Sequence, residues 1–250
     1  MRLHPPRWRL ELFDTLPSTS DHCIARAEAG EPEGLAVLAR SQTRPRGSRG
    51  RSWSQAGGTL AVSVLLRPYA PSHAPLATWP FLAALAFHDA LCLTPAHRSA
   101  IRLKWPNDVT LDGRKLGGIL IESAMQPDAA HAASAWLVIG FGANLASAPD
   151  LPERRAACLA ELAAPPEAAE IAARLLAALS LWMQRATAEG FGLVREEWLR
   201  RAHPPGTKLA VRTGDGQTAG SFCSIAEDGT LLLAVGDEIQ RISTGEILFS

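Results

Sequence analysis

The sequence has no excess of charge of either sign, because 25 lysine and arginine residues balance 25 aspartate and glutamate residues. No apolar run approaches the roughly 20 residues of a membrane-spanning helix, and residues 1–8 (MRLHPPRW) lack the apolar core of a signal peptide. A neutral chain offers no global field to attract nucleic acid or an anionic membrane. We therefore expect a soluble cytoplasmic protein with no nucleic acid and no membrane among its partners.

Cysteine is scarce, and its spacing carries no motif. Cys23, Cys92, Cys158 and Cys223 stand alone, with no C-x-x-C pair and no histidine at zinc-binding spacing. This pattern favours reduced packing thiols over a disulfide framework. We also expect no metal site built from these residues.

The sequence contains enough apolar residues to form a full hydrophobic core. Hydrophobic residues make up 47% of the 250 positions. A chain of this length forms one large domain, or a large domain with a small one. The sequence contains no internal repeat and no low-complexity linker, so a folded chain is expected throughout.

The N-terminal part alternates between strand-like and helix-like patterns. A strand-like pattern over 8–13 precedes turn and cap residues and an Ala-rich helix that ends at Gly30. An apolar run at 34–39 predicts a buried strand, and the run at 59–66 predicts a further strand. The segment 80–93 has the length of a helix and an N-terminal proline. These patterns predict an α+β protein.

The rest of the larger part is β-rich and then helical. Residues 101–145 contain several strand-like runs, and Asp112-Gly113 between two of them is a strong hairpin signal. Two helices are predicted at 167–189 and 191–202, the first with apolar residues near helical spacing. We expect these helices to close the larger domain.

Past residue 203 the composition changes to short strands separated by Gly-Asp, Asp-Gly and Thr-Gly turns. Short strands joined by tight turns predict a small SH3-like β-barrel. We therefore divide the chain into a large domain, residues 1–203, and a small β domain, residues 204–250.

An arginine-rich loop follows the second predicted strand. Arg44, Arg46, Arg49 and Arg51 are interleaved with proline and glycine, which disfavour a helix and let the backbone close around a ligand. Arginine pairs bidentately with carboxylate or phosphate. Taken alone, the loop is equally typical of a solvated or RNA-binding segment. Its place between two apolar strands favours an anion-binding site.

Three further segments gather polar and glycine residues at predicted strand ends. Lys104–Asp108 (KWPND) places a cation, an aromatic ring, an amide and a carboxylate together, where sites commonly lie. A strand-capping turn is the simpler interpretation. Lys115–Glu122 (KLGGILIE) and Gly140–Asn144 (GFGAN) carry glycines inside strands, which weaken a strand unless a ligand must approach the backbone.

In this order, the segments resemble the catalytic domain of biotin protein ligases. The motifs are Ser-Thr-Ser at residues 18–20, Gln-Thr and the arginine loop closing on Trp53, and the KWPND, KLGGILIE and GFGAN segments. The resemblance extends from about residue 8 to residue 200, and the β-rich tail is similar to the C-terminal domain of that family. Because the catalytic pattern starts at the N-terminus, the chain resembles the short class without a DNA-binding domain.

The resemblance implies a mixed β-sheet flanked by helices, as in class II synthetases and biotin/lipoate ligases. It also implies a biotin pocket in which polar side chains hydrogen-bond a buried, rigid ring. The residues that match this pocket are Ser18, Thr19, Gln42, Arg46, Trp53, Lys115, Gly117 and Gly118. For a serine or threonine alone, a helix cap is the competing interpretation.

A second set matches the nucleotide side of the family's site. Its members are Arg49, Arg51, Lys104, Asn107, Asp108 and Asn144. Of both sets, Lys115, Arg46, Arg49 and Asp108 match the catalytic positions, with Lys115 bridging the biotin carboxylate and the α-phosphate. Two roles stay open for Asp108. It either orients or deprotonates the acceptor amine, or it contributes only to binding the metal and the nucleotide.

Two departures from the family pattern affect this assignment. Pro45 and Ser48 stand where the family loop usually has a glycine and an arginine, which leaves open which arginine holds the carboxylate. Ser20 replaces the usual asparagine of Ser-Thr-Asn.

The resemblance implies that biotin and ATP, with Mg²⁺, form biotinyl-5′-AMP and pyrophosphate. Biotin then passes to a lysine of a biotin carboxyl carrier protein. A lipoate-type protein ligase is the alternative enzyme, and a nucleic-acid-binding protein built around the arginine loop is the alternative of another class. The sequence leaves a homodimer open.

Overall fold

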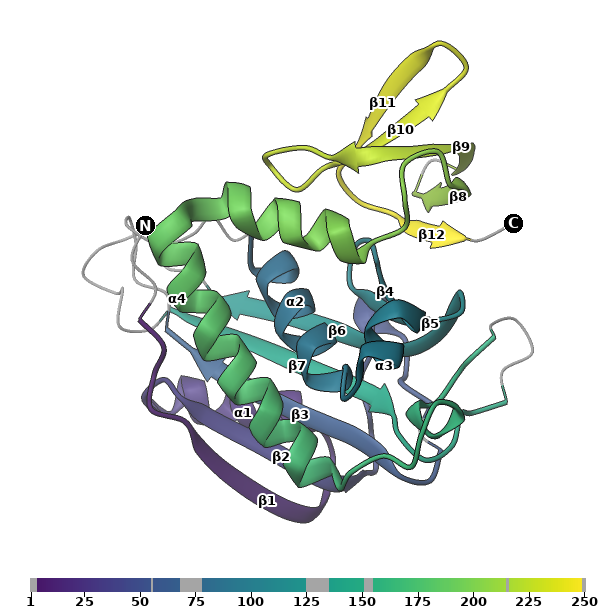
Figure 1. Cartoon of the computed structure of the whole chain (residues 1–250). Coiled ribbons are helices and arrows are strands. Elements are labelled where there is room, and N and C mark those ends of the chain that lie inside the picture. Colours follow the sequence, from purple (N-terminus) through teal and green to yellow (C-terminus); the bar gives the residue numbers. More distant parts are fainter. Residues whose placement is uncertain are drawn as a thin grey trace.

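The computed structural model describes residues 4–54, 56–67, 78–124, 135–150, 155–214 and 216–248. Its larger sheet consists of β1 Arg9–Leu16, β2 Leu35–Gln42, β3 Thr59–Leu66, β4 Ile101–Lys104, β5 Asp108–Leu111, β6 Arg114–Ala124 and β7 Trp136–Asn144. The strand order is β1-β2-β3-β7-β6-β5-β4, and only β1 and β2 run parallel (Figure 1). The sheet is therefore mixed, as expected.

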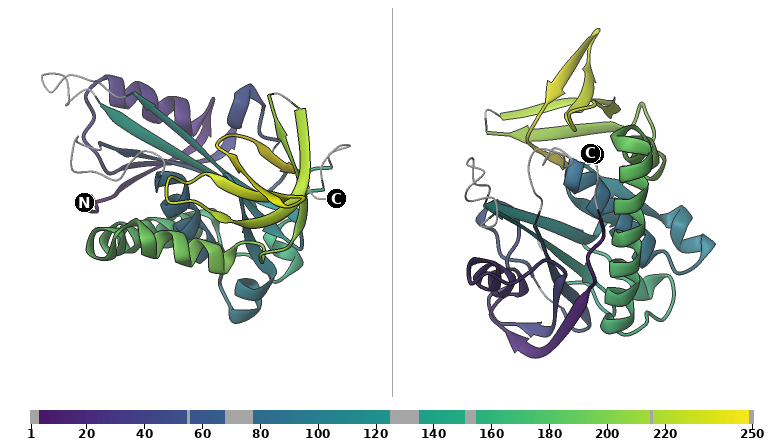
Figure 2. Two further views of the ribbon diagram at one scale, coloured as in Figure 1. Left: turned by 90° about the horizontal axis from the view of Figure 1, so that it is seen from above. Right: turned by 90° about the vertical axis from the view of Figure 1, so that its left-hand side faces the viewer.

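Helices cover both faces of this sheet. They are α1 Thr19–Glu28, α2 Trp79–Leu91, α3 Pro95–Ala100 and α4 Ala168–Arg201, with short 3-10 turns at η1 Ser48–Gly50 and η4 Leu159–Glu161. Figure 2 shows α1 on one face and α4 on the other, where α4 packs along α2. The expected α+β fold, a mixed sheet flanked by helices, is confirmed.

Strand β3 lies inside the sheet, between β2 and β7, and is buried along its whole length. The strand predicted at 59–66 is confirmed, and its burial accounts for the apolar run, because a strand covered on both faces does not alternate between apolar and polar residues. Helix α1 packs on one side of β3 and α4 on the other. The core thus has two layers, one on each side of the sheet.

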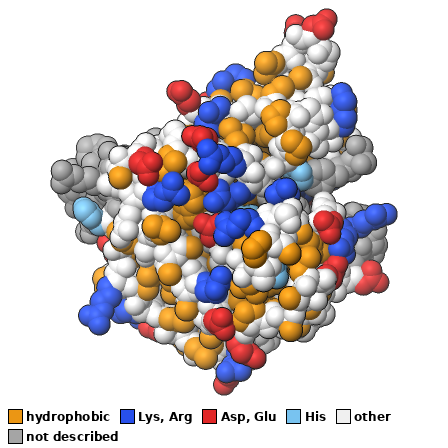
Figure 3. All heavy atoms as spheres, viewed as in Figure 1, with side chains coloured by type: hydrophobic (Ala, Val, Ile, Leu, Met, Phe, Trp, Pro, Cys, Tyr) orange, Lys and Arg blue, Asp and Glu red, His pale blue; other side chains and the backbone are white. Residues whose placement is uncertain are grey.

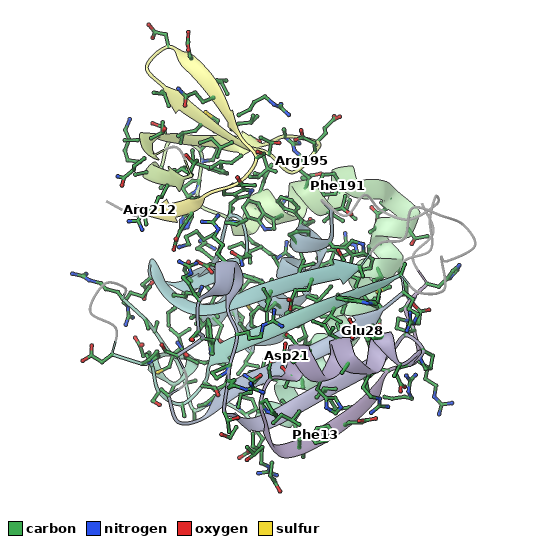
Figure 4. The ribbon with its side chains drawn as sticks, turned by 180° about the vertical axis from the view of Figure 1, so that it is seen from behind. Phe13, Asp21, Glu28, Phe191, Arg195 and Arg212 are labelled. Atoms are coloured by element: carbon green, nitrogen blue, oxygen red, sulfur yellow. The ribbon has the colours of Figure 1, made fainter. Side chains whose placement is uncertain are left out.

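The two helices predicted at 167–189 and 191–202 form one element, α4, with a break at Gly190. Gly190 has φ 80° and ψ −176°, which lies outside the helical region and is open to glycine without strain. The predicted boundary is confirmed. The second segment reaches the C-terminal sheet, where Arg195 donates hydrogen bonds to the Ile225 carbonyl and the Ser224 hydroxyl (Figure 4).

The C-terminal strands are β8 Lys208–Thr213, β9 Gly216–Ile225, β10 Leu231–Val235, β11 Glu238–Ile242 and β12 Glu246–Leu248. They form an antiparallel sheet with the order β11-β10-β9-β8-β12. Within the described residues no pairing of β11 with β12 closes the sheet, so the structure shows an open β-sheet where a barrel was predicted. The β10–β11 hairpin extends away from the larger sheet (Figure 1).

All four cysteines lie in the described part of the chain, and all four are free thiols. Burial raises the pKa of Cys23 and of Cys92 to about 12. Such thiols stay protonated and unreactive near neutral pH. In the same described ranges, no helix is both long enough and apolar enough to cross a membrane.

Asp89 joins α2, α3 and α4. Its carboxylate accepts a hydrogen bond of 2.8 Å from the Trp182 indole and lies 3.3 Å from Arg98 and 3.6 Å from Arg201. Burial alone would raise the pKa of Asp89, but hydrogen bonds from His88 and Trp182 and the charge of Arg201 lower it to about 2. The folded protein therefore stabilises the ionised form of Asp89 relative to the unfolded chain.

We expect Asp89→Asn to reduce the free energy of unfolding at pH 7 by about 2 kcal/mol. Because the folded-state pKa lies below the unfolded one, the difference is complete above about pH 5 and shrinks as pH falls through 4 toward 2. Urea unfolding of both proteins at several pH values measures it. Asp14→Asn is the control, because that side chain is 94% exposed. A difference independent of pH would contradict the assignment.

Candidate functional site

A cleft of about 530 Å³ lies between the start of α1, the end of β2 and the middle of β6 and β7. Its lining residues are Ser18, Thr19, Ser20, Gln42, Arg46, Gly47, Ser48, Trp53, Leu60, Ala61, Asn107, Lys115, Gly118, Ile119, Leu120, Gly140, Phe141 and Gly142. We call it the pocket. Figure 4 shows the neighbouring Asp21 at the start of α1.

Ser18, Thr19 and Gln42, predicted as one set, meet at one end of the pocket. Ser18 is the N-cap of α1, and its hydroxyl accepts a hydrogen bond of 3.3 Å from the Asp21 amide. Gln42 lies at the end of β2, where its Oε1 accepts from the Thr19 amide at 2.8 Å and from the Thr19 hydroxyl at 3.2 Å. The helix-cap interpretation is therefore correct for Ser18, while the same turn also faces the pocket.

Trp53 forms a wall of the pocket against β7. A Cβ atom at Gly142 would lie 3.2 Å from the Trp53 indole, closer than most real contacts, so glycine lets the ring approach the strand. The Lys115 ammonium lies 5.4 Å from the centre of the same ring, within the range of a cation–π interaction. Trp53 and Lys115 thus share one side of the pocket.

The two adjacent glycines of β6 face opposite sides. A Cβ atom at Gly118 would lie 3.2 Å from Lys115 Nζ, on the pocket side. One at Gly117 would lie 3.1 Å from the Phe87 ring of α2, on the core side. The prediction that Gly117 walls the pocket is therefore corrected: this glycine makes room for Phe87.

Next to the pocket, Asp108 lies between two lysines. Its Oδ1 is 2.5 Å from Lys115 Nζ and its Oδ2 is 3.0 Å from Lys104 Nζ, and the carboxylate side chain is only 11% exposed. Burial alone would raise the pKa of Asp108, but the charges and hydrogen bonds of Lys115 and Lys104 hold it below its usual range. Asp108 is thus an anion near neutral pH and orients both lysines.

Arg46 spans the pocket between two carboxylates. One amino group donates to Asp21, in the first turn of α1, and the other donates to Glu122, on β6. Burial alone would lower the pKa of Arg46, but the bonds to Glu122 and Asp21 raise it. Arg46 therefore stays positively charged, and Asp21 and Glu122 hold its guanidinium at the pocket.

Arg49 and Arg51 point to the C-terminal sheet. An Arg49 amino group donates to the Gly245 carbonyl at 2.6 Å, and Arg51 contacts the Glu246 carboxylate at 2.9 Å. Both line a second cleft of about 360 Å³, together with Asn107 of the KWPND segment. These arginines thus lie beside the pocket rather than in it.

The two asparagines predicted for the nucleotide side lie apart. Asn107 lines both clefts, and its amide donates to the Ile119 carbonyl at 2.6 Å. Asn144 ends β7, is buried, and lines neither of these clefts. Its amide donates to the Ala157 carbonyl at 3.0 Å, while its Oδ1 has no hydrogen-bond partner among the described residues.

Sequence reasoning missed four side chains of this region. Asp21 and Glu122 hold Arg46, Glu246 holds Arg51, and Ser63 lies under Thr19. A signal existed for Ser63, the one polar residue within the apolar run 60–66. None existed for Glu246, which lies far from its partner in sequence.

The pocket is lined by hydroxyls and an amide, and Lys104, Lys115 and Arg46 lie at its border. These features define a class: α+β proteins that bind a polar, negatively charged small molecule. The comparisons with known proteins define the family within it. The family model described as "Biotin/lipoate A/B protein ligase family" matches residues 13–138. The chain belongs to this family.

Individual relatives of the chain support the same family. The chain is 35% identical over 224 residues to a biotin–[acetyl-CoA-carboxylase] ligase of Paracoccus denitrificans, covering 85% of this chain and 89% of the relative. It is 31% identical over 253 residues to the enzyme of that name from Mycobacterium tuberculosis, covering 96% and 89%. A biotin protein ligase structure from Aquifex aeolicus, with biotin and ATP, shares the fold with a TM-score of 0.78 at 24% identity, covering 96% and 97%.

Proposed function

We propose that the chain is an ATP-dependent biotin protein ligase. It activates biotin with ATP to biotinyl-5′-AMP, releases pyrophosphate, and transfers biotin to a lysine of a biotin carboxyl carrier domain. The observation that carries the proposal is the Lys104–Asp108–Lys115 cluster at the edge of a polar pocket, in a chain 35% identical to a biotin–[acetyl-CoA-carboxylase] ligase.

In the first step, a carboxylate oxygen of biotin attacks the α-phosphorus of ATP, and pyrophosphate leaves. Two anions must meet, so their repulsion opposes the reaction. Lys115 lies at the pocket border with its ammonium already oriented by Asp108. A preorganised cation at the point where charge develops typically supplies about 3–4 kcal/mol. We assign this role to Lys115, with Arg46 as the second cation.

We propose that Ser18, Thr19 and Gln42 bind the ureido ring, with Trp53 and Gly118 as walls. The second cleft, with Arg49, Arg51 and Asn107, is proposed for the phosphates or the departing pyrophosphate. Its two arginines already hold the Glu246 carboxylate and a backbone carbonyl, oxygen ligands similar to those of a phosphate.

In the second step, the acceptor amine attacks the acyl carbon, AMP leaves, and the amine loses a proton. A general base works best with a pKa near the working pH. Asp108 has a pKa below its usual range, and both of its oxygens contact lysines. We therefore propose that Asp108 is a counter-ion that orients the lysines rather than the base.

Mg²⁺ was expected with the nucleotide. In the described ranges, no group of three or more His, Cys, Asp and Glu side chains is placed to hold a metal ion. Asp108 is paired with Lys104 and Lys115, and Glu246 with Arg51. These residues do not fit a resident metal site, so we propose that Mg²⁺ arrives on the triphosphate, which supplies most of its ligands.

We further propose the division into a catalytic domain, residues 1–203, and a C-terminal domain, residues 204–250. The two sheets share no strand, and α4 ends at Arg201 just before the boundary, which supports the division. A cytoplasmic location is proposed with it, supported by four free cysteines, which suit a reducing compartment.

Incubation with ATP, Mg²⁺ and either biotin or lipoate tests the function. We expect pyrophosphate release with biotin and not with lipoate, and biotin transfer when a carboxyl carrier domain is added. Release with lipoate alone would identify the lipoate-type ligase instead. Nucleic-acid binding without ATP turnover would favour a nucleic-acid-binding protein instead. The face in Figure 3 argues against that function, because basic and acidic side chains are interspersed on it.

A further inference from the structure

The chain contains three lysines, and two of them lie beside the pocket. Of the 25 lysine and arginine residues, only Lys104, Lys115 and Lys208 are lysines. Lys104 and Lys115 flank Asp108, whereas Lys208 lies exposed on β8. The distinction matters in a protein proposed to make an acyl-adenylate, because that reagent acylates amines. A guanidinium stays protonated and does not react in this way.

Lys115 is the lysine placed to meet the adenylate. Its side chain lines the pocket, and a Cβ atom at Gly118, on the pocket side of β6, would lie 3.2 Å from its Nζ. Lys104 lines neither cleft, and its ammonium donates to the Ile247 carbonyl at 3.3 Å besides contacting Asp108. In the role proposed above, Lys115 contacts the two groups that become the acyl-phosphate bond.

An ammonium has no lone pair with which to attack this bond, but a neutral amine has one. The nitrogen of a neutral Lys115 would attack the acyl carbon, the bond from that carbon to the phosphate oxygen would break, and AMP would leave. The nitrogen would then lose a proton to water and remain as an amide that carries biotin. Lys115 therefore has to stay a cation to remain unmodified.

Two neighbours favour the ammonium form of Lys115. Asp108 Oδ1 accepts a hydrogen bond of 2.5 Å from Lys115 Nζ, and the low exposure of Asp108 limits screening by water. The attraction is mutual. Burial alone would raise the pKa of Asp108, but the charges of Lys115 and Lys104 hold it below its usual range. The Trp53 ring, 5.4 Å from the ammonium, adds a cation–π interaction that a neutral amine lacks.

We propose that Lys115 is a latent self-biotinylation site, and that Asp108 prevents this reaction by keeping the Lys115 amine protonated beside the adenylate. The proposal rests on the biotin ligase function and adds a protective role to the counter-ion role of Asp108. Without the anion, Lys104 and Lys115 are two like charges in a partly buried place, which favours loss of a proton from one of them.

The test supplies biotinyl-5′-AMP directly, so that no adenylation is required, and measures biotin on each lysine by peptide mass spectrometry. Lys208 is the internal reference, because it is exposed and reports acylation by adenylate in solution. In Asp108→Asn we expect the ratio of biotin on Lys115 to biotin on Lys208 to rise at least about tenfold over wild type. A tenfold change corresponds to about 1.4 kcal/mol of lost stabilisation of the ammonium.

Two comparisons assign this biotin to the Lys115 nitrogen of the folded protein. The double variant Asp108→Asn/Lys115→Arg should lose the additional biotin, because a guanidinium is not acylated. Unfolding would expose all three lysines alike, and so would raise biotin on Lys104 together with Lys115. Asp228→Asn, in an exposed ion pair on the C-terminal sheet, is the matched control and should show the wild-type ratio.

A folded Asp108→Asn protein with the wild-type ratio would overturn the proposal. If this variant does not fold, Asp108→Asn/Lys104→Gln decides, because it removes the second unpaired charge. An unchanged ratio there contradicts the proposal as well. If wild-type protein does not bind biotinyl-5′-AMP, the biotin ligase function itself fails, which is a separate result.

Discussion

Lys115→Ala should lower the rate of biotin-dependent pyrophosphate release at least about 100-fold, the size of effect seen when one preorganised charge-stabilising group is removed. The fold should persist. Lys115 is a partly exposed side chain at the pocket border, and Asp108 keeps Lys104 at 3.0 Å as a partner. Single-turnover pyrophosphate release, with urea unfolding as the check on stability, measures both.

Lys208→Ala is the matched control for this variant. Lys208 is exposed on β8, where its ammonium donates to the Ser221 hydroxyl. The Lys208→Ala protein should therefore release pyrophosphate at the wild-type rate. A folded Lys115→Ala protein with near-wild-type release would remove Lys115 from the chemistry and, with it, the proposed neutralisation of the two anions.

Asp108→Asn should impair both half-reactions by about 100-fold. The substitution keeps the shape of the side chain but leaves Lys104 and Lys115 facing each other without the anion between them. Breaking such a buried pair costs about 3–5 kcal/mol of stability, so unfolding by urea must be followed in parallel. Pyrophosphate release reports the first half-reaction, and transfer from added biotinyl-5′-AMP to an acceptor domain reports the second.

The comparison of the two half-reactions separates the roles. Lys115 is proposed to act at the α-phosphate, which is attacked in the first step and leaves as part of AMP in the second. A counter-ion that orients Lys115 is therefore needed in both, whereas a general base would be needed in the transfer alone. Wild-type adenylation with lost transfer would therefore show that Asp108 acts as the base. Asp228→Asn, in an exposed ion pair with Arg241 on the C-terminal sheet, is the control.

Regular periodicity made much of the fold predictable. The run at 59–66 coincides with β3, because a strand buried on both faces consists of apolar residues whatever its neighbours are. The helix boundary near 190 was predictable for a local reason as well, since Gly190 adopts a backbone conformation that helices lack. The short helix α3 was missed because six residues give too little pattern.

The face of each site residue on β6 was not predictable. Regular alternation would place Lys115 on the same side as Gly117. A register irregularity between β5 and β6 puts both Leu116 and Gly117 toward the core, and Lys115 then shares a side with Gly118. Bulges re-aim side chains in this way, and a sequence pattern of period two does not reveal them.

By itself the sequence determined the classes of side chain available and their order: an amide and hydroxyls first, then arginines, then KWPND and the glycine-rich strand. Those are local properties, which composition and spacing carry. Only the tertiary structure decided which of them meet: Arg46 with Asp21 and Glu122, and Arg51 with Glu246. The reason is physical, because contacts between residues far apart in sequence depend on sheet order, register and the docking of the C-terminal strands, none of which a single segment encodes.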